Sequence, residues 1–189
     1  MRNRRTMRLA GYDYSQTGAY FITICSQNRD CLFGEIRDSD MRLNGYGVIV
    51  RDEWVKSSGI RKEIKLDEFV VMPNHIHGIV WIRNAVGANG RSPLHRTNMG
   101  SKTLSSFVAG YKSTVTKQIN GLRRLPGVPV WQRNYYEHVI RGEMELNRIR
   151  QYIMENPLKW DTDSENPNKI RDSLLPRLMS GKIRVIKYG

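Results

Sequence analysis

The stretch from Val70 to Ile82 constrains the fold of this sequence more than any other segment. It is the most hydrophobic strand candidate in the chain, and β-branched and aromatic residues dominate it from Ile76 onward. Such residues, alternating with a period of two, are typical of a pleated β-strand. Pro73 and Asn74 interrupt the stretch, which predicts a bend or bulge at that point. We therefore predict one strand over residues 70–82, with an irregularity just before its histidines.

Two histidines stand in this strand, on either side of one isoleucine. The period of two places His75 and His77 on one face and Ile76 on the other. Histidine is the commonest metal-binding side chain, so two neighbouring imidazoles on a rigid strand indicate two ligands of a metal site. Two hydrogen-bonded histidines on a half-exposed sheet face explain this triplet equally well. A third ligand and a nucleophile would have to come from another element.

The charge of the chain indicates a polyanionic partner. The sequence has 189 residues and a net charge of +13, and its Lys and Arg residues occur along its whole length. A folded and strongly basic domain most often binds nucleic acid. An anionic membrane surface is a weaker alternative, because no basic amphipathic helix with a bulky apolar face stands out.

Length and composition predict one soluble globular domain with terminal extensions. No apolar run approaches the length that spans a bilayer, and the basic start has no hydrophobic region of a signal peptide behind it. We therefore expect a cytoplasmic protein without a membrane partner. Cys25 and Cys31 form no Cys-x-x-Cys pair, so we expect reduced thiols rather than a zinc ribbon or a redox motif.

The remaining hydrophobic patterns predict an α+β domain. Apolar spacing indicates strands and helices that alternate along the chain. We expect strands over residues 19–25 and 131–141, helices over 43–58, 104–122 and 143–156, and a long loop over 84–102. This order predicts a ferredoxin-like, split βαβ layout, an antiparallel sheet with helices packed mainly on one face.

The pattern also divides the chain into a basic N-terminal arm (residues 1–18), a central domain (19–160) and a C-terminal tail (161–189). Arginines beside tyrosines in the arm suit phosphate contacts and base stacking, although a frayed terminus is the alternative. Lys112 lies on a helix face that is either solvated or in contact with phosphates. The candidate nucleic-acid contacts are Arg4, Arg5, Arg8, Tyr12, Tyr14, Lys112 and Arg133.

Tyr152 and Asn156 are four residues apart in the last helix, so they share a face beside its apolar seam. Each has an ordinary alternative, a tyrosine at the core edge and a helix C-cap before Pro157. Other tyrosines fit structural roles better. Tyr111 lies in an apolar helical stripe, and the adjacent Tyr135 and Tyr136 point to opposite faces of a strand.

At this point the sequence resembles a known family. His75-Ile76-His77 has the His-hydrophobic-His form of the HUH endonucleases, and residues 151–157 resemble the catalytic-helix motif of their single-tyrosine transposase branch. The likeness extends from about Arg8 to Trp160. The stretches that resemble the REP-associated tyrosine transposases are residues 11–15, 71–77, 107–113 and 131–141. One departure is Asn156, where many relatives carry glutamine; its shorter arm would have to lie closer to a metal.

This resemblance implies an enzyme that cuts and rejoins single-stranded DNA near the foot of a hairpin. Tyr152 would be the nucleophile that forms a 5′-phosphotyrosine and leaves a free 3′-OH. His75, His77 and the Asn156 side-chain oxygen would hold a divalent cation, Mg²⁺ or Mn²⁺. Two imidazoles suit softer metals than Mg²⁺ better, so Mn²⁺ or Ni²⁺ would also fit.

Two other functions compete with this interpretation. A regulator that binds hairpin DNA but no longer cuts it would have the same basic charge without cleavage activity. A metal hydrolase acting on small phosphoesters would retain the histidines, but the basic charge disfavours it. The sequence does not decide between a monomer and a homodimer, or the role of the tail.

Overall fold

The computed structural model describes residues 17–83 and 103–167, and the description below concerns those ranges. The arm residues Arg4, Arg5, Arg8, Tyr12 and Tyr14, the loop 84–102 and most of the tail lie outside them. The strands are β1 (Gly18–Cys25), β2 (Gly34–Arg37), β3 (Asp40–Leu43), β4 (Ile64–Val71), β5 (His75–Ile82) and β6 (Tyr136–Ile140). The helices are α1 (Gly45–Ile60), α2 (Leu104–Arg123) and α3 (Glu143–Glu155), with short 3-10 turns η1 (Gln27–Arg29) and η2 (Pro157–Thr162).

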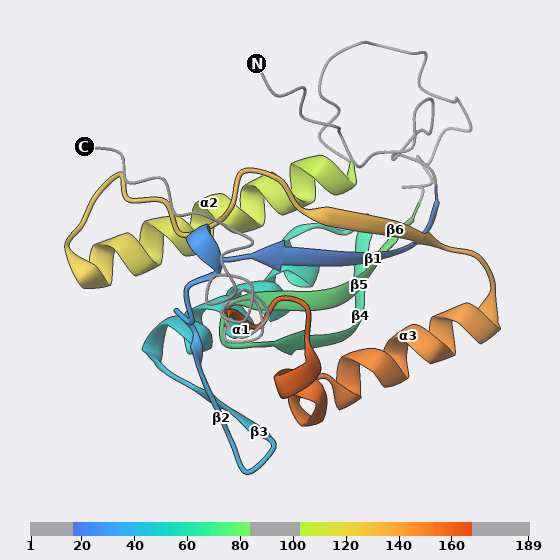
Figure 1. Cartoon of the computed structure of the whole chain (residues 1–189). Coiled ribbons are helices and arrows are strands. Elements are labelled where there is room, and N and C mark those ends of the chain that lie inside the picture. Colours follow the sequence, from blue (N-terminus) through green and yellow to red (C-terminus); the bar gives the residue numbers. More distant parts are fainter. Residues whose placement is uncertain (1–16, 84–102, 168–189) are drawn as a thin grey trace, which may run out of the picture.

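Four strands form the main sheet in the order β4-β5-β1-β6, and every neighbouring pair is antiparallel. Between β1 and β4 the chain forms the β2–β3 hairpin and then helix α1. Helix α2 lies between β5 and β6 in the chain. This connectivity and strand order are those of the ferredoxin-like layout, so the fold class predicted from the sequence is confirmed. Figure 1 shows α2 on one side of the sheet, α3 on the other, and the β2–β3 hairpin projecting from the body.

The stretch that we predicted as one strand is two strands. β4 ends at Val71 and β5 begins at His75, and the pair runs antiparallel with Val71 opposite Ile76. The connection is closed by a 2.8 Å hydrogen bond from the Met72 amide to the His75 carbonyl. The predicted bend before the histidines is therefore a complete chain reversal. Pro73 suits such a turn because it has no backbone N–H that would need a partner in the sheet.

One face of the sheet packs against α1 and α2 and holds the larger core. The even-numbered side chains of β1 and β5 lie in it, together with apolar residues of both helices. Trp54 from α1 is fully buried there and makes an edge-on contact with Phe107 of α2, with ring centroids 5.6 Å apart. Gly78 makes room for it, because a Cβ at that position would lie 2.4 Å from the Trp54 ring. The Trp54 ring can therefore pack this closely on β5 only because residue 78 is glycine.

Helix α3 packs on the opposite face, which carries the odd-numbered side chains of β1 and β5. Leu146 and Ile153 are buried against Ala19 and Ile79, and Ile149 is partly buried beside them, which confirms the predicted seam of this helix. Beside this seam, the Arg150 guanidinium of α3 donates two hydrogen bonds to Asp67 of β4, at 2.8 and 2.7 Å. Two of the three described helices thus cover one face, and α3 holds the face where the odd-numbered histidines lie.

Other boundaries differ locally from the sequence expectation. The β2–β3 hairpin was not predicted, because its short strands alternate without a strong apolar face. Leu122, the last residue of the predicted helix over residues 104–122, is 64% exposed. The last strand begins only at Tyr136, and Trp131 forms an isolated bridge with Ser26. Of the helices in the described ranges, none is long and apolar enough to cross a membrane.

Candidate active site

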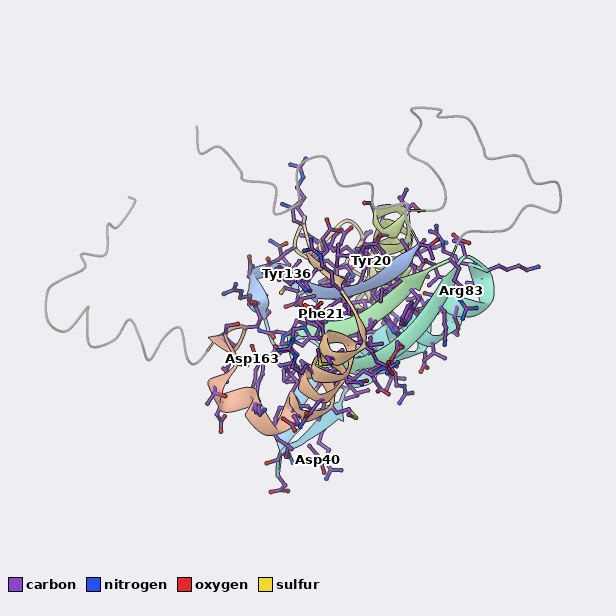
Figure 2. The ribbon with its side chains drawn as sticks, turned by 90° about the vertical axis from the view of Figure 1, so that its right-hand side faces the viewer. Tyr20, Phe21, Asp40, Arg83, Tyr136 and Asp163 are labelled. Atoms are coloured by element: carbon purple, nitrogen blue, oxygen red, sulfur yellow. The ribbon has the colours of Figure 1, made fainter. Side chains whose placement is uncertain are left out.

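The site lies on the sheet face covered by α3. His75 and His77 of β5 project from it, as the period of two predicted, and β1 places Cys25 opposite His75 and Thr23 opposite His77. Both imidazoles are buried, at 0% and 3% exposed. The Phe21 ring lies against His77, with centroids 5.3 Å apart. Figure 2 labels Phe21, Tyr136 and Asp163, which come from β1, β6 and the segment after η2.

The two imidazoles converge through their Nε2 atoms, which are 3.0 Å apart. Each Nδ1 atom is engaged behind them, His75 Nδ1 with Asn74 Oδ1 and His77 Nδ1 with Thr23 Oγ1, both at 2.8 Å. Second partners of this kind fix the ring orientation and the tautomer of metal-binding histidines. The two rings therefore converge because Asn74 and Thr23 orient them, and not only because both histidines lie on one face of β5.

The tautomer of His75 follows from the Asn74 amide. Asn74 Nδ2 donates to the carbonyl oxygens of Arg29 and Glu165, at 3.0 and 2.7 Å, so Oδ1 must be the atom that faces His75. Because a carbonyl oxygen only accepts, His75 Nδ1 carries the proton and Nε2 presents a lone pair. The Thr23 hydroxyl can accept from His77 Nδ1 in the same way, which leaves a second lone pair directed at the same point.

Burial keeps both imidazoles neutral. It lowers the pKa of His77 to about 3. The pKa of His75 is also well below its usual value, because of burial first and then the neighbouring His77 and Arg29. Neutral imidazole is the form that binds metal. The pair is therefore ready to act as ligands at neutral pH.

Tyr152 reaches the histidines from α3. Its hydroxyl oxygen lies 3.3 Å from His77 Nε2, and its ring makes an edge-on contact with Phe21, with centroids 6.0 Å apart. The residue is 42% exposed, so the hydroxyl is accessible from outside. Burial and then Asp163 raise the pKa of this phenol, and a hydrogen bond from the Asn156 side chain partly offsets them. Tyr152 therefore faces the sheet, against the strand that carries both histidines.

Asn156 ends α3 and lies beneath Tyr152. It is 2% exposed, and its Oδ1 atom has no hydrogen-bond partner within the described residues. A buried carbonyl oxygen without a partner is costly. A buried oxygen of this kind suits a cation, which is the role that the family resemblance implies for Asn156.

A second oxygen comes from a residue that the sequence analysis left in the tail. Asp163 Oδ2 lies 3.8 Å from His75 Nε2, its side chain is 4% exposed, and this oxygen has no hydrogen-bond partner among the described residues. One ligand atom each from His75, His77 and Asp163 lies within 4.8 Å of the others. No periodic pattern indicated this residue, because Asp163 follows η2 in a polar, turn-like segment.

The donor set fits a divalent cation. Two imidazole nitrogens, an amide oxygen and a carboxylate oxygen combine ligands of the borderline and hard classes. Two of these four atoms are buried oxygens without partners in the described part of the chain, which is an arrangement that a bound cation would satisfy. Glu165, two residues after Asp163, is already engaged, since it pairs with Arg29 at 2.8 Å.

The structure separates the other predicted residues from this cluster. Lys112 is half-buried, and its Nζ donates to the carbonyl oxygens of Gln132 and Asn134, each at 2.9 Å. Arg133 is exposed between them. Tyr111 is in the core against α1, donating to the Val50 carbonyl, as its apolar stripe predicted.

Comparisons with known proteins agree with this fold. No protein-family model matches the sequence. An uncharacterized protein of Haemophilus influenzae is 40% identical over 167 residues, which cover 85% of this chain and 92% of that protein. Among solved structures, the chain is similar to a REP-associated tyrosine transposase bound to a REP hairpin. The identity is 21%, the TM-score is 0.51, and the match covers 80% of this chain and 74% of that one. The resemblance carried by the sequence motifs is thus confirmed at the level of the fold.

Proposed function

This chain belongs to the same protein family as the Haemophilus influenzae protein and has the fold of a REP-associated tyrosine transposase, and from that premise we propose a function. It is a metal-dependent, HUH-type transposase that cuts and rejoins single-stranded DNA at hairpins. One observation carries the proposal. The Tyr152 hydroxyl lies 3.3 Å from His77 Nε2, and the converging nitrogens of the two imidazoles lie beside the buried Asp163 carboxylate.

Each residue has a role in this chemistry. The Tyr152 phenol loses its proton to solvent as its oxygen attacks a phosphodiester phosphorus. The 3′-oxygen of the preceding nucleotide leaves and takes up a proton as a free 3′-OH, and a 5′-phosphotyrosine remains. The retained phosphoester conserves the bond energy for rejoining, in which a 3′-OH displaces the phenolate. His75, His77, Asn156 and Asp163 would hold a divalent cation, whose charge stabilises the negative charge that develops on the phosphate oxygens.

The surroundings of Tyr152 suit this role. Burial raises the pKa of its phenol above the ordinary value, so the group is protonated at neutral pH until it attacks. Its position in the last turns of a helix packed by Ile149 and Ile153 fixes the hydroxyl relative to β5. A nucleophile held in one orientation contributes to rate because less freedom is lost on the way to the transition state.

The ligand set favours Mn²⁺ over Mg²⁺. Mg²⁺ prefers oxygen ligands and retains several waters, whereas imidazole suits later transition metals. A mixed set of two nitrogens and two oxygens therefore suits Mn²⁺, although Mg²⁺ in excess would support the same chemistry.

A hairpin is the substrate that the comparisons and the charge together favour. The similar solved structure holds a REP hairpin, and this chain has a net charge of +13. A basic surface binds the phosphate backbone of any nucleic acid, so the charge supports DNA binding in general. The similarity to a hairpin-bound protein supports a hairpin as the form of DNA that is bound.

A covalent-capture experiment tests the proposal. Full-length protein is mixed with a labelled single-stranded hairpin oligonucleotide from repeats flanking its own gene, with Mn²⁺ or Mg²⁺, and run on a denaturing gel. We expect a slower protein–DNA band that disappears with chelator and in Tyr152→Phe. Tyr46→Phe, on α1 at the other face of the sheet, should retain the band.

The outcomes separate the alternatives. A band that persists in Tyr152→Phe would overturn the assignment of the nucleophile. Tight hairpin binding without any band, at every metal tested, would replace the transposase with a non-cutting hairpin-binding protein. Turnover of a generic small phosphodiester with no DNA band would instead identify a metal hydrolase.

A further inference from the structure

A cavity of about 370 Å³ opens beside the nucleophile, between β6 and the segment that contains Ser164 and Glu165. His77 and Tyr152 form part of its wall, so any group bound in it lies next to the reacting phosphate of the proposed reaction. The rest of the wall includes three aromatic rings and two amide residues, namely Phe21, Tyr135, Tyr136, Gln132 and Asn134. Its volume lies in the range of small-molecule sites.

The aromatic part of the wall is a stacking surface. Tyr136 is 41% exposed on the edge strand β6, and its ring meets Phe21 edge-on, with centroids 6.3 Å apart. Phe21 in turn lies against His77 and Tyr152. An exposed ring that is supported from behind is what a nucleobase stacks on in single-strand binding proteins.

The amide part of the wall is held from below. Lys112 Nζ donates to the backbone carbonyls of both Gln132 and Asn134 and lies 5.8 Å from the Tyr135 ring centre. Its burial lowers the pKa to about 8. Within the described ranges, neither amide side chain has a hydrogen-bond partner. The segment therefore offers two available amide groups on a backbone that is fixed in place.

The charges on the wall balance. Arg29 is the cation that lines the cavity, and its guanidinium is already paired with Glu165 at 2.8 Å. A phosphate would find no available cation among the described wall residues and would lie near a carboxylate. A flat, uncharged ligand with hydrogen-bonding edges fits better.

We infer that this cavity binds the nucleobase of a nucleotide adjacent to the scissile phosphate. Tyr136 stacks on the base, while Gln132 and Asn134 bond to its edge. A side-chain amide offers one donor and one acceptor, which matches adenine best, and unpaired bases expose these edges. The inference rests on the proposed function for the identity of the ligand, and it adds a specificity pocket to the catalytic cluster.

The experiment uses full-length protein and hairpin oligonucleotides that carry fluorescent 2-aminopurine, in turn, at each unpaired position next to the hairpin foot. A linear oligonucleotide of the same composition is run in parallel. We expect quenching at one position. Tyr136→Ala should remove it and weaken binding about 5- to 150-fold, whereas Tyr136→Phe, which keeps the ring, should retain it.

A second arm tests the amides. Binding is measured with each of the four bases at the quenched position, using Gln132→Ala and Asn134→Ala. We expect the wild-type preference to flatten in both variants, whereas Val55→Ala, exposed on α1 at the other face, should leave it unchanged. Melting temperatures for every variant show whether the fold is intact.

The outcomes distinguish this pocket from the proposed function. Wild-type protein without quenching at any position, or equal quenching in Tyr136→Ala, overturns the pocket even if Tyr152 captures DNA. Quenching and base preference without capture support the pocket and overturn the cleavage chemistry. A preference that survives both amide substitutions removes Gln132 and Asn134 from the inference.

Discussion

At the scale of single residues, Asn74 orients a ligand of the proposed metal site although it is not itself a proposed ligand. Its Oδ1 fixes the His75 tautomer, while its Nδ2 joins η1 to the segment around Glu165. Loss of such a partner typically weakens metal binding about 10- to 100-fold. We therefore expect Asn74→Ala to lower Mn²⁺ affinity by that factor in calorimetric titration, with capture falling in parallel.

Asn74→Asp is the matched variant for this prediction. It keeps the oxygen that accepts from His75 Nδ1 and loses the two backbone contacts. We expect it to bind Mn²⁺ at least as well as wild type while unfolding at a lower temperature. Equal affinity in Asn74→Ala and wild type would mean that the strand alone orients the ring.

Asp163 shows which part of the site the sequence could predict. Alternation places His75 and His77 on one face of a strand, and helical spacing places Tyr152 and Asn156 on one face of a helix. Their roles in the proposed site came from the family resemblance. Asp163 follows a 3-10 turn, where no period relates it to the rest of the chain, so only the folded backbone reveals its position. The turn at residues 72–74 was missed for a related reason, because one hydrophobic run can hold two strands.

Asp163 and Asn156 can be ranked by substitution. Both oxygens lack partners within the described ranges, but the carboxylate carries a charge and is the stronger ligand for a hard cation. We expect Asp163→Asn to weaken Mn²⁺ binding more than Asn156→Ala does, as measured by titration of the metal. The reverse order would make Asn156 the principal third ligand.

At the scale of elements, a bidentate ion pair helps to hold α3 in position beside its apolar seam. Arg150 lies two residues before Tyr152 and binds both Asp67 oxygens, and Trp81 Nε1 donates to the same carboxylate at 2.9 Å. We expect Arg150→Met to lower the free energy of unfolding by about 1 kcal/mol, because Arg150 is partly exposed, and to reduce capture further by loosening Tyr152. Arg148→Met, exposed on the same helix, is the control for both measurements.

The same pair gives a pH dependence with a defined sign. The Arg150 guanidinium first, and then the Trp81 hydrogen bond, hold the Asp67 pKa well below its ordinary value. A depressed folded-state pKa adds stability above the ordinary carboxyl pKa near 4, and that stability is lost as the pH falls below it. The difference in melting temperature between wild type and Asp67→Asn should therefore be largest near pH 7 and shrink below pH 4. A difference that is constant with pH would show that the carboxylate charge contributes nothing.

At the scale of the whole molecule, the two faces of the sheet differ, because one holds the main hydrophobic core and the other holds the candidate site. The face under α1 and α2 holds the large core, and the face under α3 holds the polar cluster with a smaller apolar seam. The alternation of strands and helices predicted the split βαβ layout, but not the strand order, because one predicted strand is the β4–β5 pair. The placement of α3 alone on the second face was not predicted either, because an amphipathic pattern shows that a helix packs without showing against which face.

The net charge of +13 makes a prediction for DNA binding as a whole. Hairpin affinity should fall linearly on a log–log plot against salt, because each phosphate contact releases counterions. Arg133 is exposed, whereas the Lys112 ammonium binds two backbone carbonyls. We expect Arg133→Ala to reduce the slope by about 1. Lys112→Met should lower affinity with little change in slope, since it releases the segment that carries Gln132 and Asn134. Equal changes of slope in both variants would place the Lys112 ammonium on a phosphate in the complex.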